Sequence, residues 1–140
     1  MTRTRGTQVT RVTEAILDQL TQGLTADSPS RTFDRRPGTF MAVHVERIGA
    51  AQYSVAHYFE QNGDLCSDPE MTFFRDADGH FYPLSFAMSY LAIYRCAAEA
   101  SERGEYLATV FDGAEQKDQA RFAADWMRNI RDQQEIPVAR

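Results

Sequence analysis

Apolar residues recur every three to four positions near the start of the chain. The residues of this pattern are Val9, Val12, Ile16, Leu17, Leu20 and Leu24. On a helix this spacing gathers them into one stripe, so the pattern predicts an amphipathic helix over about residues 9–24. Residues 26–38 are rich in Ser, Pro, Asp and Arg without periodicity, and they predict a linker or surface loop. Residues 1–8 are expected to form a flexible arm.

Beyond residue 40 the apolar period changes to two, which is typical of strands. Apolar and polar positions alternate over residues 41–46 and again over residues 53–60, and this predicts an antiparallel hairpin. Keeping the apolar side chains on one face requires odd residues opposite odd residues, and a loop of odd length such as residues 49–51 gives that register. The register places His57 on the apolar face and His44 on the other face.

The dipeptide Asp-Gly at residues 78–79 predicts a second hairpin, because it tolerates positive φ at both central positions of a type I′ turn. With this two-residue loop, Phe73 faces Leu84 and Met71 faces Phe86. A three-residue loop would turn Met71 and Phe73 out of the core, which costs about 2 kcal/mol for each large side chain. The two-residue loop is therefore expected.

Between this hairpin and the end of the chain the pattern is mixed. Pro83 lacks an N–H group and is expected at a sheet edge or a bulge. Residues 89–110 combine a helical composition with the alternation of a strand, and the pattern alone leaves both open. A second amphipathic helix is predicted over about residues 115–134 from Phe122, Ala123, Trp126, Met127 and Ile130.

These elements predict one α+β domain over residues 1–140. Its antiparallel sheet is expected to hold four to five strands, made by two consecutive hairpins, with one helix before the sheet and one after it. No apolar run approaches the roughly 18 residues of a membrane span, and residues 1–11 lack the apolar segment of a signal peptide. We therefore expect a cytoplasmic protein with no membrane contact.

Charge is unevenly distributed along the chain. The formal net charge is −5, and residues 1–36 hold six arginines against four acids, a balance of +2 that leaves −7 for the remainder. An acidic body repels phosphate, so nucleic acid is an expected partner only through the Arg-rich amino-terminal arm. The acidic surface favours a protein partner with basic patches.

Acidic residues are concentrated in residues 57–86. Paired carboxylates can act as acid and base in a hydrolase, and the candidates here are Glu60, Asp64, Asp68, Glu70 and Asp76 together with His57. The same acids occupy turn sequences, where Asx hydrogen bonds explain them without catalysis. The run DADG also resembles the start of a calcium loop, but the twelfth position of that loop would be Ala87 instead of an acid.

Other catalytic and metal-binding patterns are weak. His44 and His57 fall on opposite faces in the expected register, whereas a two-residue loop would place them directly opposite and allow a zinc or nickel pair. Cys66 and Cys96 are isolated in the sequence and are expected to be free thiols, with a disulfide as the alternative. No glycine-rich nucleotide loop or nucleophile motif occurs in the sequence. No cofactor and no metal are expected.

Aromatic residues between positions 53 and 94 are more numerous than one sheet face can bury. Tyr58, Phe74 and Phe81 fall opposite the inward-facing row. Either the two helices cover both faces of the sheet, or the aromatic residues form an exposed patch that binds a protein partner or a second copy of the chain. The candidate interaction surface comprises Tyr58, Glu60, Asp64, Asp68, Glu70, Phe74 and Phe81.

Three motifs carry a family resemblance: SVAHYFEQNGDL at residues 54–65, DPEM at 68–71 and DADG at 76–79. They resemble a family of small bacterial, plasmid and phage proteins described as a domain of unknown function. The resemblance extends over residues 44–86 and over FAADWMRNIRDQ near the end of the chain. A more distant similarity, to another small uncharacterised bacterial family, involves Pro69, Met71 and the same carboxy-terminal segment. Both imply a strand over residues 90–98, and neither implies catalytic residues.

We therefore expect a small binding protein, an accessory or host-interacting factor of a mobile genetic element that acts through protein–protein contact. The alternatives are a metal-dependent or acid/base hydrolase and an acidic inhibitor of a nucleic-acid defence system. A closed pocket with converging carboxylates and a histidine would favour the hydrolase. Ordered aromatic and acidic side chains on an open surface would favour binding or phosphate mimicry.

Overall fold

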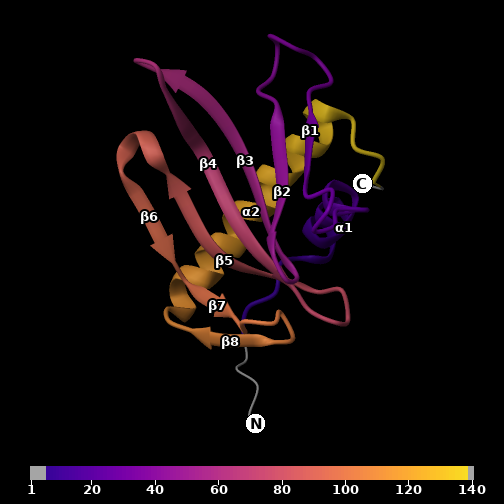
Figure 1. The fold of residues 1–140 in the computed structure, drawn as a ribbon, viewed down its shortest axis with the longest axis vertical. Coiled ribbons are helices and arrows are strands. Elements are labelled where there is room, and N and C mark those ends of the chain that lie inside the picture. Colours follow the sequence, from indigo (N-terminus) through magenta and orange to yellow (C-terminus); the bar gives the residue numbers. More distant parts are fainter. Residues whose placement is uncertain (1–5, 139–140) are drawn as a thin grey trace.

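Both helices lie against one sheet in an α+β arrangement, as the computed structural model of residues 6–138 shows (Figure 1). The elements are α1 (Arg11–Thr21), β1 (Ser30–Phe33), β2 (Val43–Gly49), β3 (Gln52–Gln61), β4 (Asp64–Arg75), β5 (Phe81–Met88), the short 3₁₀ helix η1 (Ser89–Leu91), β6 (Ile93–Cys96), β7 (Ala98–Ala100), β8 (Leu107–Val110) and α2 (Gly113–Gln134). Strands β1 to β6 form one antiparallel sheet in chain order, and β7 and β8 form a second. The predicted α+β class is confirmed, but the main sheet has six strands instead of four to five.

The two helices lie where the apolar periodicity predicts them. The hydroxyl of Thr10 accepts a hydrogen bond from the Thr13 N–H at 3.3 Å and caps α1. Gly23, with φ of +80°, follows its last turn, so α1 is shorter than the apolar stripe. Asp112 caps α2 through the Glu115 N–H at 3.0 Å. No helix within the described residues is long and apolar enough to cross a membrane.

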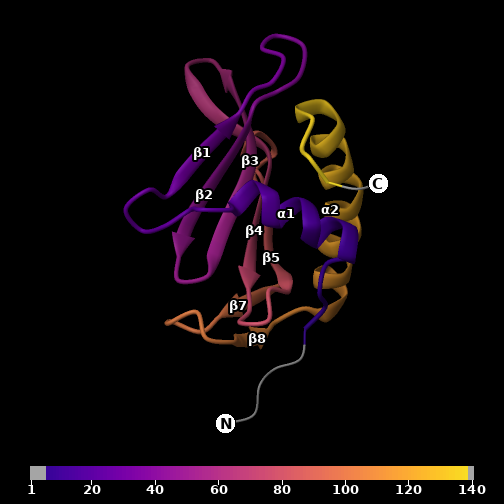
Figure 2. The same ribbon diagram turned by 90° about the vertical axis from the view of Figure 1, so that its right-hand side faces the viewer.

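Both helices cover the same face of the sheet, and the main core lies between the helices and that face (Figure 2). Ile16 and Leu20 from α1 and Met127 from α2 are fully buried there against Met71 and Phe73 of β4. Each such side chain contributes about 2 kcal/mol through its removal from water. This apolar layer determines which face of β2, β3, β4 and β5 points toward the helices.

The stretch 26–38, expected to be a linker or surface loop, contains β1. Its Arg31 side chain donates hydrogen bonds to the carbonyl oxygens of Leu20 and Gln22, which the end of α1 leaves without helical partners. Phe33 packs against the main core. One apolar residue in four produces no visible alternation, so the sequence pattern missed this strand. Of the expected amino-terminal arm, residues 1–5 lie outside the described part of the chain, and Thr7 donates to Gln116 at 2.7 Å.

The first hairpin has the predicted register but a different turn. Val45 lies opposite Val55 and Arg47 opposite Tyr53, so odd residues face odd residues as predicted. The ladder shifts between Arg47 and Gly49, and Gly49 then lies opposite Gln52. A bulged residue within β2, and not a longer loop, therefore supplies the odd residue.

The second hairpin has a three-residue loop, so the predicted two-residue turn at residues 78–79 is wrong. Arg75 lies opposite Phe81, and the Asp76 N–H donates to the His80 carbonyl at 2.9 Å. Of the loop residues only Gly79 has positive φ, at +88°. The Asp76 carboxylate accepts hydrogen bonds from the Asp78 and His80 N–H groups, both at 2.9 Å, and this stabilises the longer loop.

Met71 and Phe73 nevertheless remain fully buried. The register of β4 and β5 shifts between Thr72 and Phe73, which restores the predicted pairing of Met71 with Phe86. Pro83 lies next to this shift, as its missing N–H group predicted. A three-residue loop is compatible with burial of Met71 and Phe86 because the ladder is interrupted, whereas the prediction required an uninterrupted one.

The β7–β8 hairpin covers one end of the other face of the sheet. Phe74 and Leu84 pack there against Ala98, Ala100 and Leu107 in a second, smaller core. Residues 89–110 therefore form three short strands after one turn of 3₁₀ helix. The single strand over residues 90–98 that the family resemblances imply is present in part, as β6 and β7, because the 3₁₀ turn occupies residues 89–91. Phe74 lies in this small core and Phe81 in the main core, both with 0% exposure. Neither can belong to an exposed aromatic patch.

Gly104, in the loop between β7 and β8, is pressed against the turn between β2 and β3. Its φ is +69°, and a Cβ atom there would lie 2.1 Å from the Ala50 carbonyl oxygen. Gly63, at the tip of the β3–β4 hairpin, has a similar φ of +84° with no atom within 4 Å of its Cβ position. A side chain at Gly63 would therefore cause backbone strain alone, whereas a side chain at Gly104 would cause both strain and a steric clash.

We predict that Gly104→Ala lowers the free energy of unfolding by about 3 kcal/mol, because the clash adds to the strain of positive φ. Gly63→Ala carries only the strain and should cost about 1 kcal/mol. Urea denaturation of both variants measures the difference. Equal losses would mean that the β7–β8 hairpin does not depend on the contact with Ala50.

Candidate functional site

The face of the sheet opposite the helices is floored by small side chains. One row of directly paired residues crosses the strands from β1 to β6, namely Ser30, Glu46, Ser54, Thr72, Ser85 and Cys96. The adjacent row runs through Thr32, His44, Ala56, Glu70, Ala87 and Tyr94. Most of these side chains are small, and the larger ones are Glu46, His44, Glu70 and Tyr94.

A groove of about 530 Å³ lies on this face between the β2–β3 turn and the β7–β8 hairpin. Thr72, Ser85 and Ala87 line it, and a hydrogen bond joins the hydroxyls of Thr72 and Ser85. Glu70 lines the same groove, as does Glu99 of β7. The groove therefore combines a polar floor with two carboxylates.

Large apolar side chains line the same groove while remaining open to solvent. Ile48 is 48% exposed, Tyr94 69% and Phe111 59%. They come from β2, from β6 and from the segment after β8, so three separate parts of the chain converge. Exposed apolar surface gathered around one groove is characteristic of a binding site.

Glu70 is held in place by neighbours on β3. Its Oε2 atom accepts hydrogen bonds from Ser54 Oγ at 2.9 Å and from the Tyr58 hydroxyl at 3.4 Å. The pKa of Tyr58 is raised, mainly by burial and then by the negative charge of Glu70. Tyr58 therefore stays protonated at neutral pH and acts as a donor. The ring centroids of Tyr58 and His44 lie 5.2 Å apart.

The remaining members of the predicted surface lie elsewhere. Glu60 and Asp64 are exposed where β3 and β4 meet, at the end of the sheet away from β7 and β8 (Figure 1). Asp68 lies in β4 before a cis peptide bond to Pro69. The acidic stretch of the sequence is thus divided among several places.

His57 does not join the acids. It lies on the helix-covered face, where its ring packs at 5.6 Å from the ring of Trp126 and its Nδ1 lies 3.0 Å from the Ala42 carbonyl oxygen. Glu70 points to the opposite face. The histidine and carboxylate required by the hydrolase hypothesis are therefore separated by the sheet itself. The predicted placement of His44 and His57 on opposite faces is confirmed.

Metal ligands are not grouped in the described part of the chain. Among residues 6–138, no three His, Cys, Asp or Glu side chains lie close enough to hold an ion. Cys66 is buried and Cys96 is exposed, and both are free thiols.

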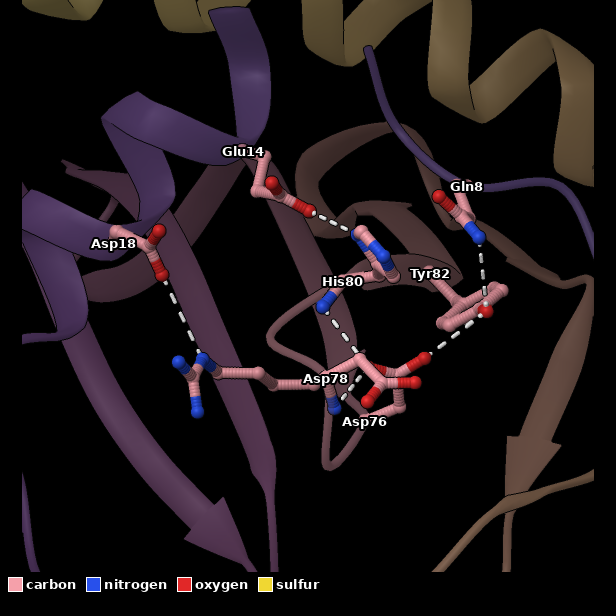
Figure 3. Close-up of polar contacts among 8 residues, drawn as sticks. Gln8, Glu14, Asp18, Asp76, Asp78, His80 and Tyr82 are labelled. Carbon is pink, nitrogen blue, oxygen red and sulfur yellow. Dashed lines mark hydrogen bonds and ion pairs between the residues drawn. The ribbon is translucent and has the colours of Figure 1, made fainter. Parts of the chain in front are cut away.

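A second polar cluster surrounds the Asp76 turn (Figure 3). Asp76 Oδ2 accepts a hydrogen bond from the Tyr82 hydroxyl at 3.2 Å, and the Gln8 amide donates to the same hydroxyl. His80 Nδ1 lies 2.8 Å from Glu14 Oε1. These contacts connect α1 and the segment before it to the β4–β5 hairpin. Asp76, one of the acids in the stretch 57–86, therefore has a structural role in this cluster.

The sequence interpretation missed Ile48, Tyr94, Glu99 and Phe111 as site residues, although Tyr94 was among the aromatic residues too numerous for one sheet face. Ile48 offered one signal, since it is apolar at a position that the alternation of β2 assigns to the polar face. Glu99 and Phe111 offered none, because their place depends on how β7 and β8 fold back. Cys96 was noted only as an isolated thiol.

Comparison with known proteins identifies the family and nothing further. A family model described as "Domain of unknown function (DUF6908)" matches residues 13–136. No curated protein and no solved structure matches the chain. Any function must therefore be argued from the geometry described above.

The contact between His80 and Glu14 predicts a pH-dependent contribution to stability. The pKa of His80 is raised, first by its hydrogen bond to Glu14, while desolvation acts in the opposite direction. Because the pKa of His80 is higher in the folded than in the unfolded state, its protonation adds to the free energy of unfolding. This contribution is fully present below about pH 6.5, the ordinary histidine pKa. It is lost as the pH rises through the pKa of the folded state.

We predict that Glu14→Gln lowers the melting temperature more at pH 5.5 than at pH 8, because only the protonated His80 forms an ion pair. In an NMR titration, the pKa of His80 should fall in the same variant. Glu102→Gln, at an exposed position in the β7–β8 loop, is the control and should show no such pH dependence. A Glu14→Gln effect independent of pH would refute the ion pair.

Proposed function

The chain belongs to the family of the domain of unknown function DUF6908, and we propose that it is a binding protein that recognises a protein partner through the groove on the open sheet face. The observation that carries this proposal is the convergence of exposed Ile48, Tyr94 and Phe111 on one groove. Burial of these side chains by a partner would supply the apolar centre of an interface. Of the predicted surface, Glu70 lines the groove and Tyr58 donates a hydrogen bond to Glu70.

The two alternative functions have less support. The hydrolase hypothesis requires a histidine beside the acids, whereas His57 packs against Trp126 on the other face. An imitation of a phosphate backbone requires a regular array of free carboxylates. The acids are instead spread over a hairpin tip, the groove and the Asp76 turn, where the carboxylate of Asp76 is occupied by internal hydrogen bonds.

The biological setting is part of the proposal. We infer a cytoplasmic accessory or host-interacting factor of a mobile genetic element. This rests on the resemblance of residues 54–65 to plasmid and phage proteins and on the free thiols Cys66 and Cys96.

Affinity capture from cells of the native host tests the groove. The double variant Tyr94→Ser/Phe111→Ser should retain at least tenfold less of the bound protein than wild type, because it removes the apolar centre of the interface. Both positions are exposed, so stability should change by no more than about 0.5 kcal/mol at each. Quantitative mass spectrometry of the captured protein gives the ratio.

Leu65→Ser is the matched control, since Leu65 is 68% exposed but lies at the other end of the sheet. This variant should capture as much protein as wild type. Equal capture by all three proteins, or capture of no specific protein by wild type, would contradict the proposal.

A further inference from the structure

One carboxylate oxygen of Glu70, Oε1, accepts no hydrogen bond from the described residues. Both of its hydrogen bonds, from Ser54 and Tyr58, go to Oε2. Within residues 6–138, no hydrogen bond or ion pair is made to Oε1. The side chain is nevertheless half-buried, so its position is fixed by neighbours while one side of the carboxylate faces the groove.

The surroundings of Glu70 are acidic. Glu99 lines the same groove, and Glu46 is close enough to act on the pKa of Tyr58. The residues that line the groove include no arginine, lysine or histidine. The Glu70 carboxylate therefore has no cationic partner among the residues of the groove, and a positive group from outside would add a charge-assisted hydrogen bond.

We propose that the groove binds an extended segment of the partner in which an arginine or lysine side chain pairs with Glu70. A neighbouring apolar side chain of that segment packs against Ile48, Tyr94 and Phe111. This inference rests on the proposed function and adds the chemistry of the partner. The groove supplies both halves of the contact: the Glu70 carboxylate and the exposed apolar side chains.

Charge selects this occupant over others. A symmetric dimer that pairs the groove with itself would bring Glu70 and Glu99 close to identical acids, in a protein with net charge −5. Nucleic acid would place phosphates against the same carboxylates. A basic peptide segment is the occupant whose charge complements the groove and whose apolar residues fit its sides.

Selection from a phage-displayed library of random twelve-residue peptides on the immobilised wild-type protein tests the inference. The selected peptides should carry an arginine or lysine near a large apolar residue. Glu70→Gln should raise their Kd at least tenfold, because it removes the charge while keeping an amide oxygen that accepts from Ser54. The peptides should also protect the exposed thiol of Cys96, which lines the groove, from alkylation.

Glu60→Gln is the charge-matched control, since Glu60 is exposed near the distant hairpin tip, and it should change Kd less than twofold. Peptides that protect Cys96 and lose affinity for Tyr94→Ser/Phe111→Ser, but bind Glu70→Gln as tightly as wild type, would overturn the inference alone. Peptides indifferent to every groove variant, or no selected peptide at all, would count against the proposed function as well.

Discussion

The register shift between β4 and β5 is the constraint on which the rest of the structure depends. Phe81 and Phe86 both pack into the main core, although they are five positions apart and would face opposite sides of an uninterrupted strand. The shift beside Pro83 gives β5 one additional residue and returns Phe86 to the helix-covered side. Without it, the three-residue loop at Asp76 would be compatible with the burial of Met71 and Phe73 but would turn Phe86 out of the main core.

The same shift shapes the open face. Leu84 joins the small core under the β7–β8 hairpin, and Ser85 directly after it enters the polar row that floors the groove. The anchoring of β7–β8 and the polar floor of the groove therefore share one local distortion. The contact of Gly104 with Ala50 then sets the hairpin against the β2–β3 turn. Adjacent positions of β5 thus anchor the β7–β8 hairpin and line the groove beside it.

The sequence predicted those features in which a single pattern dominates. Ile16, Leu17 and Leu20 marked α1, and Val45 and Val55 gave the correct register of the first hairpin, because burial of one face leaves one choice. The loop of the β4–β5 hairpin was predicted wrongly. The hydrogen bonds that the Asp76 carboxylate accepts from Asp78 and His80 stabilise a longer turn than Asp-Gly prefers. Strands β7 and β8 have three and four residues, too few for any period to be recognised.

The candidate site was predictable only in part, for a related reason. Residue type indicated Glu70 and Tyr58, but the sequence showed five acids between positions 64 and 78 without distinguishing them.

What distinguishes the acids is where each carboxylate finds partners. Both carboxylate oxygens of Asp76 accept hydrogen bonds, one from backbone N–H groups of its own turn and the other from the Tyr82 hydroxyl. Asp64 lies at an exposed hairpin end, where water solvates its charge at little cost. Glu70 is half-buried, lines the groove and has only one oxygen bonded by the described residues, so its other oxygen can accept from a cationic group in the groove. The position in the fold, and not the residue type, makes it the centre of the site.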